Sequence, residues 1–377
     1  MKKKVYVVFG TRPEAIKLAP IILDLKKEKK IKCIVCVSAQ HREMLDQVLE
    51  AFNIIPDIDL DLMSPNQSIS SLTSKIIDKL DYYLKKDKPE CVIVQGDTTT
   101  VLSAAISSFY NKIPVIHVEA GLRTFDLNSP WPEEGNRALT SRISAIHFAP
   151  TIQSQENLIN EGIDKQNIFV TGNSVIPALF LATDIVKKTP PPIPGLDEEF
   201  LKRLETKKSI LITTHRRENF GDGFESICKA ILELSNLYKD VFFIFPVHLN
   251  PNVREPVNRI LDSNKNIILL EPLSYLPFIR LMNLSTIILT DSGGIQEEAP
   301  SLGKPVLVMR DKTERPEAIK AGTVKLVGTN KNNIVDETSK LISNSKHYNS
   351  MSFSHNPYGD KDTVKKMIKI LKSFLKI

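Results

Sequence analysis

The sequence predicts an α/β protein built from two Rossmann-like domains that face each other across a cleft. Its 377 residues exceed what one hydrophobic core supports at roughly 100 to 200 residues per domain. Short β-rich runs alternate with helical stretches along both halves, which is typical of parallel sheets. One segment, 187–195, interrupts this alternation with four prolines in five residues, through which neither element can continue. We therefore expect domains at 1–186 and 196–361, with a C-terminal helix, 362–377, joining the first.

Each half contains six predicted strands, and each strand is followed by a helical stretch. In the first half the strands are Val5–Phe9, Lys32–Val37, Cys91–Gln95, Pro114–Val118, Ala145–Ala149 and Ile168–Thr171. In the second half they are Ser209–Thr213, Val241–Phe245, Ile267–Leu270, Thr286–Thr290, Pro305–Met309 and Val324–Val327. Ligands bind beyond the carboxyl ends of such strands, so the loops that follow them are where functional residues are expected.

Composition and charge exclude several classes of protein. A content of 42% hydrophobic and 25% charged residues is that of an ordinary globular protein. The net charge of +6 comes from scattered lysines, and basic residues do not interleave with aromatic ones, so we expect no nucleic-acid partner. The apolar run at the start has five residues and predicts a strand, not a signal peptide. No apolar stretch reaches the roughly 18 residues of a membrane span. We expect no membrane association and a cytoplasmic location.

The cysteines do not predict a metal or redox site. Cys33 and Cys36 are three residues apart on a predicted strand and therefore point to opposite faces. We expect buried core thiols and no metal.

The first strand leads into a candidate anion site. Gly10 permits a sharp turn, and Pro13 suits the start of a helix, whose free N–H groups bind anions. Arg12 precedes that start, and Lys17, one turn later, leans back toward it. The alternative is that Arg12 and Lys17 pair with surface acids. No glycine-rich dinucleotide or P-loop motif follows the strand, so we expect no nucleotide cofactor of that kind.

Acidic residues follow the next strands. Asp97 lies in the loop after one strand, Glu119 comes directly after the next, and Glu133 follows in a third loop. Carboxylates at successive strand ends can share one cleft, where burial and repulsion separate their pKa values for acid and base chemistry. Asp97 could instead cap the following helix, and Glu133 or Glu134 could pair with an arginine one turn away. Glu119 ends a buried strand, and buried acids are rarely without function.

The second half presents cationic and glycine-rich loops at its strand ends. His215 and its arginine neighbours follow one strand, and His248 follows the next. A third strand leads into Ser292, Gly293 and Gly294, where a helix start suits a phosphate, although tight turns also use glycine. Glu298 on that helix is a candidate acceptor for ribose hydroxyls.

Together these loops resemble one known family, the bacterial non-hydrolysing UDP-N-acetylglucosamine 2-epimerases. The resemblance runs nearly from end to end and keeps the order and spacing of six motifs: Gly10–Lys17, Gln95–Thr98, His117–Arg123, Pro132–Arg137, Thr214–Asn219 and Asp291–Pro300. It implies a fold of glycosyltransferase-B type, a homodimer, and an isomerase that needs no cofactor. The implied partners are UDP-GlcNAc, UDP-ManNAc and UDP, and the implied reaction eliminates UDP to give 2-acetamidoglucal and then adds it back, supplying ManNAc units for surface polysaccharide.

The resemblance also implies residue roles. The implied catalytic residues are Asp97, Glu119, Glu133 and His215. The implied substrate-binding residues are Arg12, Lys17, Asp97, Glu119, His215, Phe278, Ser292, Gly293, Gly294, Glu298 and Arg315. An activating second UDP-GlcNAc is implied at Gln40, His41, Arg42, Gln67, Arg216 and His248, although Asn66 departs from the arginine of some relatives.

Three other functions are compatible with parts of this pattern. A hydrolysing relative would release free ManNAc and UDP. A glycosyltransferase of the same fold would require an acceptor, since a fold does not fix a function. A non-catalytic nucleotide-sugar sensor would have no need of acids at three strand ends.

Overall fold

The computed structural model describes residues 2–38, 42–62, 67–262, 264–313, 315–353 and 355–377. The chain folds into two compact units, 1–181 with 358–377, and 182–357. Helix α7, Val175–Lys188, runs without interruption through the limit at residue 181. The domain limits predicted at residues 186, 196 and 361 therefore stay a prediction.

Unit 1 contains a parallel sheet in which, among the described residues, seven strands have the order β3-β2-β1-β4-β5-β6-β7. The strands are β1 Lys3–Phe9, β2 Ile31–Val37, β3 Ile58–Asp59, β4 Cys91–Gln95, β5 Val115–Val118, β6 Ile146–Ala149 and β7 Ile168–Val170. Six of these coincide with predicted strands. The seventh, β3, is a two-residue edge strand whose short pairing with β2 leaves no pattern in the sequence.

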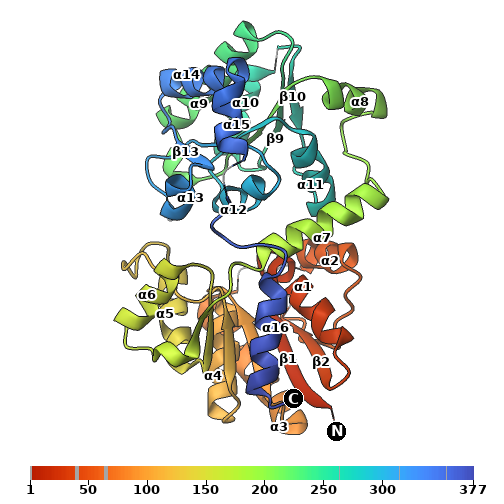
Figure 1. The fold of residues 1–377 in the computed structure, drawn as a ribbon, viewed down its shortest axis with the longest axis vertical. Helices are drawn as coiled ribbons and strands as arrows, with labels where there is room; N and C mark the ends of the chain where they lie inside the picture. Colours follow the sequence, from red (N-terminus) through yellow and green to blue (C-terminus); the bar gives the residue numbers. More distant parts are fainter. Residues whose placement is uncertain (1, 39–41, 63–66, 263, 314, 354) are drawn as a thin grey trace. The chain divides into compact units, whose positions relative to one another are not determined.

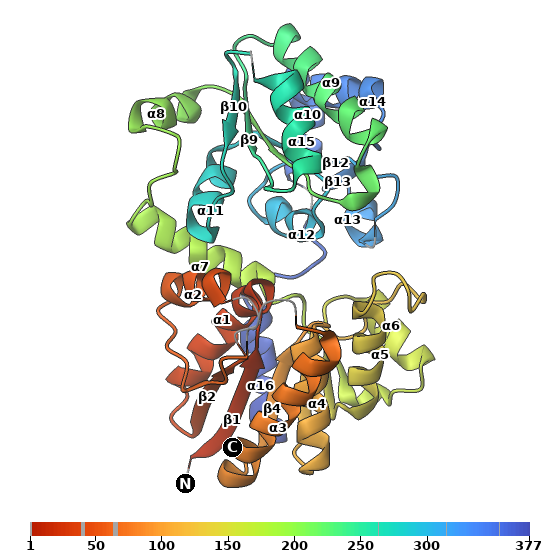
Figure 2. The same cartoon turned by 180° about the vertical axis from the view of Figure 1, so that it is seen from behind.

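Helices cover both faces of this sheet. They are α1 Arg12–Lys27, α2 Arg42–Ala51, α3 Ile69–Asp87, α4 Thr99–Tyr110, α5 Glu133–Ile143, α6 Ile152–Asn160 and α16 Thr363–Phe374, with a 3-10 turn at Lys165–Asn167. Helix α16 lies in front of the sheet in Figure 1, and α3 and α4 lie in front in the reverse view of Figure 2. The core on the α3–α4 face joins Tyr6 and Val8 to Ile76, Leu80 and Ala104.

Unit 2 repeats the architecture. Among its described residues, six parallel strands have the order β10-β9-β8-β11-β12-β13. They are β8 Ser209–Thr213, β9 Phe242–Pro246, β10 Ile267–Leu270, β11 Ile287–Thr290, β12 Val306–Val308 and β13 Val324–Leu326. The predicted fold class, α/β with two Rossmann-like domains, is confirmed.

The helices of unit 2 enclose a second core. They are α8 Glu198–Thr206, α9 Asp222–Leu237, α10 Pro251–Leu261, α11 Tyr275–Leu284, α12 Gly293–Ser301, α13 Pro316–Lys320, α14 Lys331–Ser343 and α15 Ser345–Ser352, with a 3-10 turn at Arg217–Asn219. Phe224 on α9 packs with Phe243 and Phe245 of β9, and Ile334 of α14 joins them.

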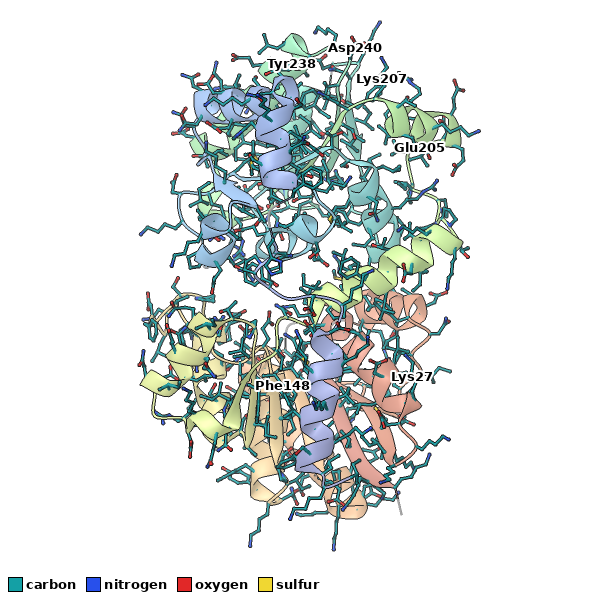
Figure 3. All side chains as sticks on the ribbon, viewed as in Figure 1. Lys27, Phe148, Glu205, Lys207, Tyr238 and Asp240 are labelled. Carbon is teal, nitrogen blue, oxygen red and sulfur yellow. The ribbon has the colours of Figure 1, made fainter. Side chains whose placement is uncertain are left out.

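The C-terminal helix α16 returns to unit 1 and packs on α1. Its buried residues Val364, Met367 and Leu371 recur at helical spacing, and Lys372 donates to Glu28 at 2.9 Å. Among the residues labelled in Figure 3, two belong to unit 1: the buried Phe148 of β6 and Lys27 in the last turn of α1. In the described part of the chain, no helix is at once long enough and apolar enough to span a membrane.

Two glycines meet where the returning chain joins unit 1. Gly172 has a φ of +92°, and a Cβ built on it would lie 2.7 Å from Thr363 Oγ1 and 3.0 Å from Gly359 Cα. Gly359 has a φ of +118°. Only glycine combines a left-handed backbone with such a close approach at little energetic cost.

We predict that Gly172→Ala destabilises unit 1 by about 2–4 kcal/mol, because it adds backbone strain to a steric clash. Differential scanning calorimetry should show a fall of several degrees in its unfolding temperature, at about 2–4 °C per kcal/mol. Gly135→Ala is the matched control, since nothing lies within 4 Å of its Cβ position in helix α5. The control should be neutral or stabilising by up to about 1 kcal/mol, and equal effects of the two changes would contradict this account.

Candidate active site

Glu119 is the centre of the strand-end cluster in unit 1. It directly follows β5, is 8% exposed and has a φ of +63°. A left-handed backbone at a residue other than glycine costs on the order of 1 kcal/mol or more and persists only where the surroundings enforce it. Such strain concentrates at functional sites, so it supports a role for this side chain.

Three side chains hold the Glu119 carboxylate. Lys17 of α1 donates to both oxygens, at 2.6 and 2.7 Å. Gln95, the last residue of β4, donates to Oε2, and Asn173, beyond β7, donates to Oε1 at 2.8 Å. The four residues come from four separate strand ends and helices, yet they converge on one charge. Lys17 thus pairs with a buried acid, whereas the alternative weighed from the sequence was pairing with a surface acid.

Asp97 lies in the neighbouring loop. Its carboxylate accepts from Arg137 at 2.6 Å, and its carbonyl accepts from the Asn136 amide at 2.9 Å. Burial raises the pKa of Asp97, with Glu119 and Glu133 adding to the rise and Arg137 opposing it. The helix cap is its neighbour Thr98, which accepts from Val101 N, so the capping alternative for Asp97 is wrong.

Glu133 begins helix α5 and is half-buried. It lies close enough to Asp97 to raise the pKa of that carboxyl. The next residue, Glu134, is buried, accepts from the backbone of Thr124 and Phe125 and lies 3.4 Å from Arg137. The alternative of a pair with an arginine one turn away therefore applies to Glu134. Glu133 instead lies near the carboxylate of Asp97.

The first loop is held by a second buried carboxylate, Glu14. It accepts from the backbone N–H groups of Gly10 and Thr11 at 3.2 and 2.8 Å and from Thr98 at 3.0 Å. Burial raises its pKa to about 7, against the lowering effect of these donors. Glu14 thereby connects the turn directly before Arg12 to the loop that carries Asp97.

His117 lies within β5, two residues before Glu119. Its Nε2 is 2.7 Å from the carbonyl oxygen of Gly96, so the ring donates there and is assigned as the Nε2–H tautomer. Complete burial lowers the pKa of His117 to about 3. The ring is therefore neutral at physiological pH and supports the Gly96–Asp97 turn.

In unit 2 the buried carboxylate of Asp291, which directly follows β11, organises the His215 loop. It accepts from the backbone N–H groups of His215 and Arg216 and from the Thr214 hydroxyl. It also accepts from the Asn219 amide at 3.1 Å, and lies 3.4 Å from His215 Nδ1. Desolvation lowers the pKa of His215, and the charge of Asp291 opposes that shift. The His215 side chain is 43% exposed and so remains available to a ligand.

Helix α12 begins at the glycine pair. Ser292 is its N-cap, and a Cβ on Gly293 would lie 2.6 Å from Arg315 Nη1, so the guanidinium lies directly over this helix start. Arg315 is oriented by Glu297 at 2.6 Å. A helix start beside a guanidinium is an anion-binding arrangement. The structure thus brings Ser292, Gly293 and Arg315 together.

The remaining predicted ligand residues of unit 2 lie on or near α11 and α12. Glu298 is 8% exposed and accepts from the Tyr275 hydroxyl at 3.4 Å. Phe278, on α11, is half-buried. In the described part of the chain, no three His, Cys, Asp or Glu side chains form a group that could hold a metal ion.

Several of the residues predicted to bind an activator contact other residues of their own unit. Arg42 pairs with Asp59 at 2.6 Å and Asp61 at 3.2 Å, and Gln67 precedes α3. In unit 2 the His248 ring stacks on His215, with ring centroids 5.9 Å apart, and Arg216 donates its backbone N–H to Asp291. Gln40 and His41 lie outside the described residues. The activator assignment stays a prediction.

Several residues of the site were given no role from the sequence, and Asp291 and Asn173 are two of them. Asp291 lies within a recognised motif but was given no role, because only the fold shows which donors it collects. Asn173 follows the predicted strand 168–171 in a polar run, Gly172–Asn173–Ser174. The same strand-end criterion that singled out Asp97 would have found it.

Known proteins resemble this chain over nearly its whole length. The family model described as UDP-N-acetylglucosamine 2-epimerase matches residues 23–372. A UDP-N-acetylglucosamine 2-epimerase of Yersinia pestis is 55% identical over 370 residues, 98% of each chain. The crystal structure of the Neisseria meningitidis enzyme bound to UDP-GlcNAc superposes with a TM-score of 0.88 and 52% identity, covering 98% of this chain and 100% of that one. The Methanocaldococcus jannaschii enzyme in complex with UDP-GlcNAc and UDP has a TM-score of 0.79 and 35% identity, covering 98% and 99%.

These matches first define the class, an isomerase with two Rossmann-like domains of glycosyltransferase-B type. More narrowly, the chain belongs to the UDP-N-acetylglucosamine 2-epimerase family. The resemblance to the bacterial non-hydrolysing members, given above on six motifs, is confirmed.

We predict that His117 makes the stability of unit 1 depend on pH. A histidine whose pKa falls on folding stabilises the fold above its unfolded pKa of about 6.5, and this contribution is lost as pH falls toward 3. The slope is about 1.4 kcal/mol per pH unit for one proton. His117→Gln keeps a donor for Gly96, so its unfolding free energy should depend less steeply on pH between 6 and 4. The exposed His248→Gln serves as control, and identical slopes for wild type and His117→Gln would refute the assignment.

We further predict that Asp291→Ala disorders the His215 loop. The substitution leaves several buried donors without an acceptor, at a cost of about 1–3 kcal/mol each. Denaturant titrations should therefore show that the free energy of unfolding of unit 2 falls by several kcal/mol. Asp291→Asn keeps one acceptor oxygen and should lose less. Asp240→Ala, which removes a carboxylate of unit 2 that is 94% exposed, is the control. An Asp291→Ala protein as stable as this control would show that the carboxylate does not organise the loop.

Proposed function

We propose that this protein reversibly epimerises UDP-N-acetylglucosamine to UDP-N-acetylmannosamine at C2. The observation that carries the proposal is the buried, strained Glu119 with Lys17 and Asp97 beside it, in a chain that belongs to the 2-epimerase family. Relatives crystallised with UDP-GlcNAc, and with UDP-GlcNAc and UDP, support UDP-GlcNAc as the substrate and UDP as the leaving group.

The reaction requires an indirect route, because the C2 proton of GlcNAc has no adjacent carbonyl to acidify it. We infer an elimination in which the C1–O bond breaks, its electrons leave with UDP, and C2 loses its proton. The product is 2-acetamidoglucal. UDP then adds back at C1 while a proton is delivered to the opposite face of C2, which restores all atoms with inverted configuration at that carbon.

The carboxylates of unit 1 accept and donate the protons in this reaction. Asp97, Glu119 and Glu133 lie together there, and their environments differ: Glu119 is paired with Lys17, Asp97 with Arg137, and Glu133 opens helix α5. Such different environments suit one carboxyl group to accept a proton and another to donate one. Arg12 and Lys17 contribute positive charge for the departing UDP.

Residues of unit 2 bind most of the nucleotide. The α12 helix start with Ser292, Gly293 and Gly294, together with Arg315 over Gly293, suits a diphosphate. His215, held by Asp291, is assigned to the same phosphates. Glu298 suits the ribose hydroxyls and Phe278 the uracil ring.

The family resemblance supports three further parts of the proposal. The protein acts in the cytoplasm as a homodimer, and its product supplies ManNAc units for surface polysaccharide. A second UDP-GlcNAc molecule activates turnover in the reverse direction. Hyperbolic turnover of UDP-ManNAc, unaffected by trace UDP-GlcNAc, would contradict that activation.

The test is proton NMR of the purified protein with UDP-GlcNAc in deuterium oxide. We predict that anomeric signals of UDP-ManNAc appear and that both nucleotide sugars acquire deuterium at C2. Free ManNAc would instead identify a hydrolase, and turnover only with an added acceptor would identify a transferase. Epimerisation without deuterium at C2 would exclude proton loss at that carbon.

Two variants test the residue roles in the same assay. Asp97→Asn and Glu119→Gln should each lower turnover by about 100-fold or more, the usual contribution of a positioned acid or base. UDP affinity, measured by calorimetry, should stay close to that of the wild type because neither carboxylate is assigned a contact with the nucleotide. Wild-type rates in both variants would remove the catalytic assignment.

A further inference from the structure

Asn173 lies where the chain joins unit 1 to the rest of the molecule. The chain passes between the units twice, through α7 and through the segment before Tyr358. The Asn173 side-chain oxygen accepts from the N–H of Val175 at 3.1 Å, at the start of α7. Its backbone N–H donates to the carbonyl of Tyr358 at 2.7 Å. One residue thus contacts both connecting segments.

The same side chain reaches the proposed catalytic centre. Asn173 is 2% exposed, and its Nδ2 donates to Glu119 Oε1 at 2.8 Å. The bond from Val175 N fixes which end of the amide is oxygen, so the amide group must present N–H to the carboxylate. The amide orientation is therefore determined by the backbone at the start of α7.

We infer that Asn173 is a positioning residue for the reaction, which holds the Glu119 carboxylate in place and links it to the two segments that connect the units. This inference rests on the proposed function, in which Glu119 transfers a proton. A donor aimed at a carboxylate favours its ionised form and fixes its direction. Gln95 donates to the other oxygen, Oε2, from the end of strand β4.

The position of Asn173 is itself defined by close packing. Gly172, directly before it, admits no side chain because Gly359 Cα and Thr363 Oγ1 lie within 3.0 Å of its Cβ position. The returning segment 358–363 is therefore pressed against the residue that precedes Asn173. A shift of that segment would move the amide relative to Glu119.

The charged and titratable groups around Glu119 come from three elements. Lys17 on α1 donates to it, Asp97 follows β4, and His117 precedes it on β5. Each of these remains in place when Asn173 is replaced, so a change in the titration of Glu119 can be assigned to the amide.

The test is a carbon-13 NMR titration of the glutamate side-chain carboxyl groups, with Glu119→Gln used to assign the Glu119 signal. Asn173→Asp is nearly isosteric and places a second carboxylate against Oε1, so the Glu119 midpoint should rise by about one pH unit or more. Asn173→Ala removes the donor and should raise the midpoint less. Asn157→Ala is the matched control: Asn157 is also buried, and it donates to the Gly121 carbonyl at 3.0 Å without touching Glu119.

Activity gives the second readout. Per folded molecule, kcat of Asn173→Ala should fall about 10- to 100-fold, as expected for one hydrogen bond to a charged group, while KM changes less than about twofold. Asn157→Ala should change neither. A merely structural Asn173 would leave the Glu119 midpoint and kcat per folded molecule unchanged, and that result would overturn the inference. If the wild type does not epimerise UDP-GlcNAc, the proposed function fails, and the titration alone still decides whether Asn173 controls Glu119.

Discussion

The burial of one negative charge, on Glu119, is the constraint on which the rest of unit 1 depends. An unpaired ionised carboxylate in a protein interior carries a large desolvation penalty, so it must be compensated by a cation and by hydrogen-bond donors. Lys17, Gln95 and Asn173 provide that compensation, and they are brought from α1, β4 and the loop after β7. The sheet order places the ends of β1, β4 and β5 side by side, with β7 two strands beyond β5. The strained backbone at Glu119 turns its carboxylate toward the groups that these ends carry.

Both units use the same device at their strand ends. A buried carboxylate accepts several N–H and O–H groups and thereby fixes a loop: Glu14 and Glu119 do so in unit 1, and Asp291 does so in unit 2. The loops so fixed carry the exposed groups, such as His215. A reaction that expels a charged leaving group benefits from groups that are oriented before the substrate binds, because no reorganisation is then needed in the transition state.

Much of this architecture could be predicted from the sequence because it is local. Twelve strands follow from short β-rich runs, whereas β3 was missed because two residues at an edge show no periodicity. Asp97, Glu119 and His215 were found because each lies within two residues of the end of a strand. The pairings of Glu119 were not predicted, although Lys17 itself was singled out, because Lys17 lies 102 residues from Glu119 and Asn173 lies 54 residues from it. Such pairings depend on strand order, which the sequence pattern leaves open. The cap at Thr98, in place of Asp97, depends on which of two adjacent polar side chains turns toward the helix start.

The central claim is that unit 1's carboxylates serve an elimination that breaks the C1–O bond. Positional isotope exchange tests it most directly. UDP-GlcNAc carrying oxygen-18 in the bridge between C1 and the β-phosphorus is incubated with the protein and followed by phosphorus-31 NMR. Elimination frees the β-phosphate to rotate, so the label should move from the bridging to the non-bridging positions at a rate comparable to epimerisation. Epimerisation with the label still wholly in the bridge would show that the C1–O bond stays intact and would contradict the account.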